Sequence, residues 1–408
     1  MPNGTAVIGA GPAGLAAAIE AARYGQVTVL EKNAKPGRKL LLTGSGQCNL
    51  THDGDSRDLL PAYGEAGKFL RQALAVRTPR DMIRFFEESG VPCLSEENGK
   101  VFPASRSARD VLNALLARCR ELKVSFSFGC AVREILRNDQ GFTLLLRCGG
   151  SFEAQRVILA SGGMSYPATG SSGDGYHLAR SLGHTVVPPV PALDGITLSH
   201  HPWRELSGLT LRPAEIRVFR QGALVLKHRD DLLITERGLS GPVIINRCGR
   251  MHDGDEIEAD LSAGRWDAAE TASLIRQNGS AGIASALHRL GLPRRMASVL
   301  AAEAGLDPKR KAAEIRKTDL AALIKAATST RFTIASAGSF SRAAATAGGV
   351  SLREVDPQRM ESRLVKGLFF AGEVLDIDGE TGGYNLQAAW STGYIAGRSC
   401  LSEENLIG

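Results

Sequence analysis

Three glycines near the amino end of the chain have the spacing of a phosphate-binding turn. Gly9, Gly11 and Gly14 form the pattern Gly-x-Gly-x-x-Gly, with Pro12 and Ala13 between the last two. In such a turn the first glycine permits a sharp bend, the second lets a pyrophosphate approach the backbone, and the third lets a helix pack closely on a strand. The amino end of the following helix favours the phosphates through its unpaired N–H groups. We therefore expect these five residues to bind a dinucleotide.

An acidic residue completes this fingerprint. Glu31 lies 17 residues after Gly14, at the end of a β-branched segment. A carboxylate in this position accepts hydrogen bonds from a ribose diol, and it would repel a 2′-phosphate. The pattern therefore favours the adenosine ribose of FAD or NAD. The fingerprint occurs once in the chain, so a separate Rossmann site for a second dinucleotide is not encoded.

These residues require a βαβ unit to position them. Residues 5–8 and 26–31 are apolar or β-branched runs, and the Ala-rich residues 12–23 between them indicate a helix. A helix that joins two such strands implies that the strands are parallel. Further elements of an α/β domain are predicted as helices over 65–90, 107–122 and 386–400, and as strands over 124–128, 131–136, 142–147, 155–160 and 367–372.

The proline-rich residues 187–191 mark a domain boundary, because proline fits poorly within helices and strand ladders. Strand-like runs follow up to residue 262, then an Ala-, Leu- and Arg-rich helical stretch, then a strand near 331–336. We predict a discontinuous dinucleotide-binding domain with two insertions. The predicted parts are 1–191 and 341–408 for the dinucleotide-binding domain, 192–265 and 330–340 for a β-rich insertion, and 266–329 for a helical insertion.

The composition narrows the class of protein. A chain of 408 residues with 43% hydrophobic and 23% charged residues is typical of a globular protein with two or three domains. Its seven cysteines are odd in number and contain no Cys-x-x-Cys pair, which argues against a disulfide framework and a zinc site. We expect no metal. The fingerprint begins close to the amino end and no run of about 18 apolar residues occurs, so we expect a cytoplasmic protein without a membrane span.

The formal charge of +6 is compatible with an anionic ligand such as a pyrophosphate, an acidic substrate or RNA. Aromatic residues make up only 5% of the chain, and no basic stripe with interleaved aromatic residues is present. We therefore expect a small-molecule substrate and no nucleic-acid partner. The sequence does not predict the oligomeric state.

Several further motifs resemble one known family. They are the Gly-rich run 37–49, the segment 161–167, Gly173–Tyr176, Gly238–Pro242, Met360–Ser362, Phe370–Asp376 and Gly382–Gln387. Together they resemble the BaiN/YhiN-type bacterial flavoproteins, described as NAD(P)/FAD-dependent oxidoreductases or as an aminoacetone oxidase family. The resemblance covers nearly the whole chain. It implies an α/β protein with a glutathione-reductase-like FAD-binding Rossmann domain and an inserted β-barrel-like part with a small helical domain.

The resemblance selects FAD over NAD as the bound cofactor and adds residues to its site. An acid after the strand 367–372 is implied to hold the ribityl hydroxyls, and the helix beginning near 385 is expected to present N–H groups to the flavin pyrimidine ring. NAD(P)H is then a transient electron donor that visits the flavin directly. The additional cofactor residues are Lys32, Arg38, Lys39, Thr43, Gly44, Gly46, Cys48, Asn49, Val132, Ala160, Ser161, Gly162, Gly372, Glu373, Asp376, Gly383, Asn385, Leu386 and Gln387.

The catalytic group is not evident from the sequence. Cys48, Tyr166, Arg342 and Tyr384 are candidates for facing a substrate, although Cys48 has no neighbouring cysteine in sequence with which to cycle as a dithiol. Family members often carry a His after a Leu-Phe-Thr segment, where this chain has Glu236. We predict an FAD-dependent oxidoreductase that performs enone or imine reduction, or amine oxidation. The alternative is an FAD-dependent tRNA-modifying or RNA-associated flavoprotein.

Overall fold

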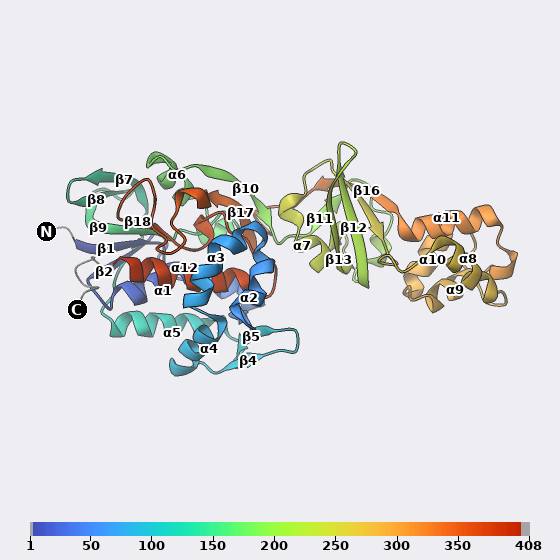
Figure 1. Ribbon diagram of the computed structural model, residues 1–408, viewed down its shortest axis with the longest axis horizontal. Coiled ribbons are helices and arrows are strands. Elements are labelled where there is room, and N and C mark those ends of the chain that lie inside the picture. Colours follow the sequence, from blue (N-terminus) through green and yellow to red (C-terminus); the bar gives the residue numbers. More distant parts are fainter. Residues whose placement is uncertain (1–2, 401–408) are drawn as a thin grey trace. The chain divides into compact units, whose positions relative to one another are not determined.

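The computed structural model describes residues 3–400, which form two compact units (Figure 1). Unit 1 comprises the chain up to Pro191 and from Phe340 onward, and unit 2 comprises Ala192–Ser339. Each unit has its own hydrophobic core. The core of unit 1 includes Val7, Leu159 and Phe370, and that of unit 2 includes Ile216 and Leu323.

Unit 1 is built on a seven-stranded sheet in the order β6-β2-β1-β9-β8-β7, with β18 also pairing with β9. The pairs β1–β2, β1–β9, β2–β6 and β9–β18 are parallel, whereas β7–β8 and β8–β9 are antiparallel. The parallel strands are apolar along most of their length because helices cover the sheet. The strands are β1 (Asn3–Ile8), β2 (Val27–Glu31), β6 (Ser125–Phe128), β7 (Val132–Asn138), β8 (Gly141–Leu146), β9 (Ser151–Leu159) and β18 (Leu368–Phe370).

Two helices from opposite ends of the chain pack against each other in unit 1. These are α1 (Pro12–Ala21) and α12 (Tyr384–Ser399), and α12 begins two residues earlier than the sequence indicates. Gly393 and Gly397 of α12 face the Ala13 and Ala17 carbonyl oxygens of α1, and a Cβ at either glycine would clash with the facing oxygen. The small residues therefore set how closely the two helices approach. Helix α5 (Ala108–Glu121) also packs against α1.

The helix predicted over residues 65–90 is two helices, α3 (Gly67–Val76) and α4 (Pro79–Glu88). The first helix ends with Arg77 as its C-cap, and Thr78 caps the second: its hydroxyl accepts from the Asp81 N–H, and the Asp81 carboxylate accepts from the Thr78 N–H. This capping box, with Pro79 at the first helical position, favours a new helix start over continuation. The predicted single helix was wrong for this reason.

The remaining elements of unit 1 are short. Residues 33–53 include a 3₁₀ turn over Leu40–Gly46 and the strand β3. The short elements are α2 (Ser56–Leu59), α6 (Asp174–Ser181), a sheet of β3 (Thr51–His52), β5 (Lys100–Pro103) and β4 (Cys93–Ser95), and a pair of β10 (Val186–Ala192) with β17 (Ala345–Val350).

Unit 2 contains a closed six-stranded barrel in the order β11-β14-β13-β12-β15-β16, which confirms the predicted barrel-like insertion. Inward-facing Ile216, Val218 and Ile257 are fully buried, as alternation along barrel strands requires. The elements are β11 (Ile196–Leu198), β12 (Thr210–Arg220), β13 (Ala223–Ile234), β14 (Gly238–Ser240), β15 (Glu256–Asp260), β16 (Thr330–Ser336) and the short helix α7 (Pro242–Ile245).

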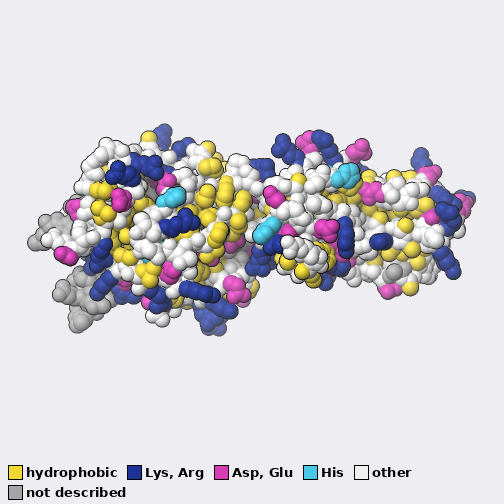
Figure 2. All heavy atoms as spheres, turned by 90° about the horizontal axis from the view of Figure 1, so that it is seen from above, with side chains coloured by type: hydrophobic (Ala, Val, Ile, Leu, Met, Phe, Trp, Pro, Cys, Tyr) yellow, Lys and Arg dark blue, Asp and Glu magenta, His cyan; other side chains and the backbone are white. Residues whose placement is uncertain are grey.

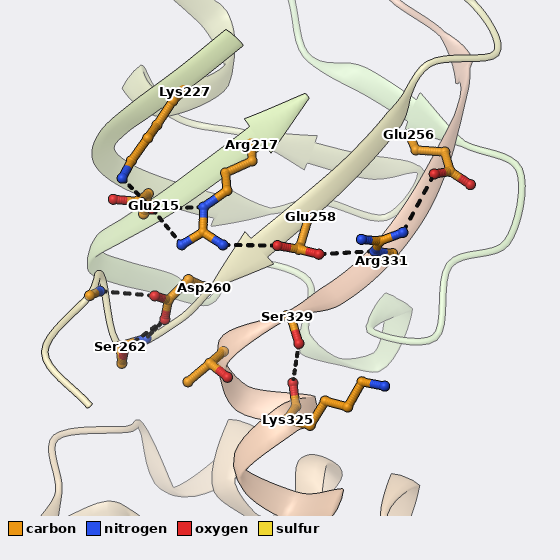
Figure 3. Close-up of polar contacts among 12 residues, drawn as sticks. Glu215, Arg217, Lys227, Glu256, Glu258, Asp260, Ser262, Lys325, Ser329 and Arg331 are labelled. Atoms are coloured by element: carbon orange, nitrogen blue, oxygen red, sulfur yellow. Dashed lines mark hydrogen bonds and ion pairs between the residues drawn. The ribbon is translucent and has the colours of Figure 1, made fainter. Parts of the chain in front are cut away.

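A ladder of charged side chains crosses four strands of this barrel (Figure 3). Lys227 Nζ lies 3.2 Å from Glu215 Oε1, Arg217 bridges Glu215 and Glu258 at 2.9 and 3.0 Å, and Arg331 Nε lies 2.9 Å from Glu258 Oε2. Single exposed pairs contribute about 0–1 kcal/mol each, but shared partners fix the strand register. Each basic residue of the ladder therefore already forms an ion pair with an acidic residue of the barrel.

The helical part of unit 2 lies between β15 and β16 in the chain. Its apolar side chains Leu287, Leu300 and Leu323 are fully buried and belong to the same hydrophobic core as the barrel. The helices are α8 (Ala268–Gln277), α9 (Ile283–Arg289), α10 (Arg294–Glu303) and α11 (Lys317–Thr328). None of the helices within residues 3–400 is long and apolar enough to span a membrane.

Candidate cofactor site

A cavity in unit 1 lies at the carboxyl ends of its parallel strands. It is bounded by the end of β1, the end of β2, the residues after β9 and β18, and the amino ends of α1 and α12. This edge of an open α/β sheet is where such folds bind nucleotides. The residues predicted from the sequence that line the cavity are Gly9, Gly11, Pro12, Ala13, Glu31, Lys32, Arg38, Lys39, Thr43, Val132, Ala160, Ser161, Gly162, Gly372, Glu373, Asn385 and Leu386.

The three fingerprint glycines have different surroundings. Gly9 has a φ of +106°, and a Cβ there would lie 2.6 Å from the Ala160 carbonyl oxygen. A Cβ at Gly14 would clash with the Gly9 carbonyl oxygen, whereas a Cβ at Gly11 would meet no atom within 4 Å. Gly9 and Gly14 are therefore required by the fold, and Gly11 leaves open space at the cavity. A diphosphate needs this kind of close backbone approach.

The amino end of α1 is open toward the cavity. Gly11 is the N-cap residue, and no side chain caps the helix. The first N–H groups of a helix have no carbonyl partner within the helix, and they carry a partial positive charge. An anionic group in the cavity would satisfy them.

Glu31 is held in place by backbone and side-chain donors. Its Oε2 accepts from the Ala10 N–H at 2.8 Å, and its Oε1 accepts from the Asn33 N–H at 2.8 Å and from Asn33 Nδ2 at 2.7 Å. Glu31 lines the cavity, and only 7% of the surface of this residue is exposed to solvent. These bonds fix the carboxylate at the end of β2, where a ribose diol would be bound.

A half-buried ion pair joins two segments that line the cavity. Lys39 Nζ lies 2.8 Å from Glu373 Oε2, although the two residues are 334 positions apart. The same carboxylate accepts from the Gly163 N–H at 3.2 Å and from the Thr346 N–H at 2.8 Å. Glu373 is thus placed by three separate segments. Beside it, Ser161 Oγ is buried and has no hydrogen-bond partner among the described residues, which suits a polar ligand group.

A second ion pair lies at the wall of the cavity, next to Glu31 in the chain. Lys32 Nζ is 2.6 Å from Asp174 Oδ2. Burial opposes ionisation of Asp174, but the hydrogen bond and charge of Lys32 outweigh it and hold the pKa of this carboxyl below its usual value. Asp174 was not predicted as a site residue, although the Gly173–Tyr176 motif that contains it was recognised.

The amino end of α12 closes the other end of the cavity. Gly383 is its N-cap with a φ of +98°, and a Cβ there would clash with the Thr51 backbone. Asn385 Oδ1 accepts from the Gly379 N–H at 2.9 Å and its Nδ2 donates to the Gly379 carbonyl oxygen at 2.8 Å, which holds the preceding turn. The first turn of α12 is therefore fixed with Asn385 and Leu386 at the cavity wall.

Gln387 lies on a different side of α12. Its side chain is fully buried, accepts from Thr51 Oγ1 at 2.6 Å and donates to the Arg77 carbonyl oxygen at 2.9 Å. Its N–H donates to the Gly383 carbonyl oxygen within the helix. Gln387 therefore joins α12 to its neighbours. The other predicted residues that do not line the cavity are Gly14, Gly44, Gly46, Cys48, Asn49, Asp376 and Gly383.

The four catalytic candidates also lie outside the cavity lining. Cys48 is fully buried, and burial raises the pKa of its thiol to about 12. Tyr384 stacks on His52 at 4.7 Å between ring centroids, and burial raises the pKa of its phenol. Tyr166 adopts a left-handed conformation and its N–H donates to the Phe340 carbonyl oxygen. Arg342 is not among the residues that form the cavity wall.

Other cavity residues had no clear signal in the sequence. The cavity is also lined by Leu178, Ala344, Ile377 and Thr392. These residue types are common in any hydrophobic core and therefore do not indicate a binding site. The four residues come from four separated segments. For Ala388 and Ala389, the three-residue spacing from Asn385 and Leu386 along a predicted helix was the available signal, because residues three apart share a helix face.

Comparisons with known proteins agree with this geometry. A family model described as "HI0933-like protein Rossmann domain" matches residues 3–399. A 3-dehydro-bile acid delta(4,6)-reductase from Clostridium scindens is 34% identical, with 97% of this chain and 98% of that protein covered. A ribosomal RNA dihydrouridine synthase from Escherichia coli is 30% identical, with 98% of each chain covered.

Solved structures show the same fold at low sequence identity. The fumarate reductase subunit FrdA of E. coli matches with a TM-score of 0.50 and 17% identity, covering 98% of this chain and 70% of that one. A 3-ketosteroid delta1-dehydrogenase from Sterolibacterium denitrificans matches with a TM-score of 0.50 and 12% identity, covering 97% and 98%. These likenesses confirm the predicted fold class.

Proposed function

This chain belongs to the HI0933-like protein family and is an FAD-dependent oxidoreductase, and we propose that it adds hydrogen across a carbon–carbon double bond conjugated to a carbonyl group. One relative is named as a delta(4,6)-reductase of a 3-dehydro-bile acid, and another as a dihydrouridine synthase. Chemically, both names describe hydrogen addition to a double bond beside a carbonyl. The proposal assigns this chain the reaction type that the two names share.

The observation that carries the proposal is a single cavity with a helix amino end at each side. The amino end of α1 suits the diphosphate of FAD, and that of α12, with Asn385 and Leu386, suits negative charge on a reduced flavin ring. When bound, FAD supplies the hydride. The residues of the chain bind and orient it: Glu31 at the adenosine ribose and Glu373, paired with Lys39, at the ribityl chain.

We further propose that NAD(P)H reduces the flavin by approaching it directly. The dinucleotide fingerprint occurs once, and the cavity that it borders is the one assigned to FAD. A second resident dinucleotide therefore has no site of this type, and a visiting nicotinamide is the simplest donor. The competing overall reaction is amine oxidation, in which the amine reduces the flavin and oxygen is the electron acceptor.

The test is anaerobic stopped-flow absorbance spectroscopy of the FAD-loaded protein. NADPH or NADH is expected to bleach the flavin, and a conjugated enone is expected to restore its colour. An amine such as aminoacetone is expected to leave the oxidised flavin unchanged. Bleaching by the amine, together with no reoxidation by any enone, would reverse the proposed direction of the reaction.

A second candidate substrate is a uracil base within RNA. The specific observation is an uneven charge distribution: residues 266–329 contain ten Lys and Arg against six Asp and Glu, a net +4 of the chain's +6. A concentrated positive charge favours polyanions over small neutral molecules. Mass spectrometry of RNA nucleosides, after incubation with the NADPH-reduced enzyme, tests it: dihydrouridine gained by a ribosomal RNA fragment supports it, and no gain opposes it.

A further inference from the structure

A groove in the helical part of unit 2 lies between α8 and α11. Arg276 of α8 and Lys317 and Lys325 of α11 line it, and all three are exposed. Within residues 3–400, no ion pair joins any of the three to an acid, in contrast to the basic residues of the barrel ladder in Figure 3. Three like charges around one groove repel one another, and a bound anion would relieve that repulsion.

The floor of the groove is apolar and has no aromatic ring. Leu320 and Ile324 of α11 form it together with Ala272 and Ala321. Figure 2 shows basic side chains around hydrophobic ones over this end of unit 2. A surface that stacks bases uses aromatic side chains, and this one has none. The groove therefore suits contact with a sugar–phosphate backbone, independent of base sequence.

Two hydroxyl groups at the end of α11 add a preference for ribose. Ser329 Oγ donates to the Lys325 carbonyl oxygen at 3.0 Å (Figure 3). Thr328 Oγ1 donates to the Ile324 carbonyl oxygen at 2.9 Å. Since each hydroxyl proton is used within the helix, the oxygen lone pairs remain as acceptors. An acceptor matches a donor, and the ribose 2′-hydroxyl is a donor that DNA lacks.

We propose that the α8–α11 groove binds the sugar–phosphate backbone of an RNA strand. Arg276, Lys317 and Lys325 would contact phosphates, while Thr328 and Ser329 would accept from 2′-hydroxyl groups. The inference rests on the second candidate substrate and names the surface that would hold it. It commits to RNA because a DNA backbone would satisfy the three charges but would offer no 2′-hydroxyl donors to the two acceptors.

The test is fluorescence anisotropy with full-length, FAD-loaded protein. The probes are a fluorescein-labelled RNA of about 20 nucleotides, long enough for several phosphate contacts, and the DNA of the same sequence. For three phosphate contacts, the wild-type affinity for RNA is expected to fall about 20-fold between about 50 and 200 mM KCl. The triple variant R276E, K317E and K325E is expected to bind at least about tenfold more weakly, with a salt slope shallower by about 2.

A charge-matched variant distinguishes the groove from general charge. Lys68, Arg71 and Arg80 are exposed on α3 and α4 of unit 1, and their replacement by Glu is expected to leave RNA binding near the wild-type value. The double variant T328V and S329A is expected to lose the preference for RNA over DNA. Melting temperature and flavin content verify that each variant is folded.

The inference is overturned if the two triple variants lose affinity equally, if the groove variant loses none, or if polyglutamate or phosphatidylserine vesicles displace RNA as well as unlabelled RNA does. Dihydrouridine formation in a ribosomal RNA fragment by the wild-type protein is measured separately. An absence of dihydrouridine contradicts the second candidate substrate but leaves the groove assignment intact, so the two failures are distinguishable.

Discussion

At the scale of single residues, the cofactor site depends on the space beside each of the three fingerprint glycines. Gly9 and Gly14 are constrained by neighbouring backbone, so their substitution would damage the fold and the ligand site together. Gly11 is different, because the space beside it is open and borders the cavity. A substitution at Gly11 can therefore change cofactor binding with little effect on the stability of the protein.

Gly11→Val is expected to abolish FAD retention while leaving the melting temperature of the apoprotein within about 2 °C, since a Cβ at Gly11 meets no protein atom within 4 Å. Flavin absorbance per protein and differential scanning calorimetry measure the two effects. Gly25→Val is the control, because Gly25 also has open space beside it but lies away from the cavity. Full flavin retention by Gly11→Val would contradict this placement of the diphosphate.

Cys48 is predicted to be an unreactive thiol. Burial raises its pKa to about 12, so it remains protonated at pH 8, and only the thiolate reacts readily with disulfide reagents. Titration of the native protein with Ellman's reagent at pH 8 is expected to modify the exposed Cys148 quickly and Cys48 only after unfolding. Rapid labelling of Cys48 in the native state, located by peptide mass spectrometry, would instead indicate an accessible redox cysteine.

At the scale of elements, the cavity depends on the contact between α1 and α12. The amino ends of both helices border the cavity, and the helices approach closely through Gly393 and Gly397. Any shift of α12 along α1 would change the distance between the two helix amino ends. The contact therefore sets the length available to the cofactor.

Gly393→Val is expected to destabilise the protein by about 1–3 kcal/mol, because the new side chain clashes with the Ala13 carbonyl oxygen. It is also expected to weaken FAD binding by displacing the α12 amino end. Urea unfolding and flavin titration measure both. Arg398→Ala, on the exposed face of the same helix, is the matched control. A variant with normal flavin affinity despite lower stability would show that the contact supports the fold alone.

At the scale of the whole molecule, the two units have separate hydrophobic cores that share no residue. The chain enters and leaves unit 2 at neighbouring points, where the Ser339 N–H donates to Asp194 Oδ2 at 2.9 Å. All the residues that line the cavity belong to unit 1. The arrangement is that of an inserted unit whose removal leaves the cofactor site complete.

We expect a protein in which a short Gly/Ser linker replaces residues 192–339 to fold and to retain FAD at the full-length stoichiometry. Its own core is intact, and short loops close at low entropic cost. Absorbance spectroscopy and analytical size exclusion test this. Aggregation, or a shortened protein that no longer holds flavin, would mean that unit 2 is needed for the cofactor site to form.

The sequence by itself determined the βαβ unit and the family, because these depend on local spacing and on motifs that are contiguous along the chain. The barrel-like form of the insertion was implied by the family resemblance. The order and spacing of Gly9, Gly11 and Gly14 were sufficient to identify the phosphate-binding turn. The split between α3 and α4 was missed although Thr78 and Pro79 encode it locally, since the apolar spacing continued across them.

Only the tertiary structure decided which motif residues reach the cavity. Leu386 and its neighbour Gln387 differ by about 100° around α12, so one lines the cavity while the other is buried against Arg77. The pairing of Lys39 with Glu373 joins residues 334 positions apart. Sequence order carries neither helix rotation relative to a neighbour nor contact between distant segments, because both are set by how the elements pack.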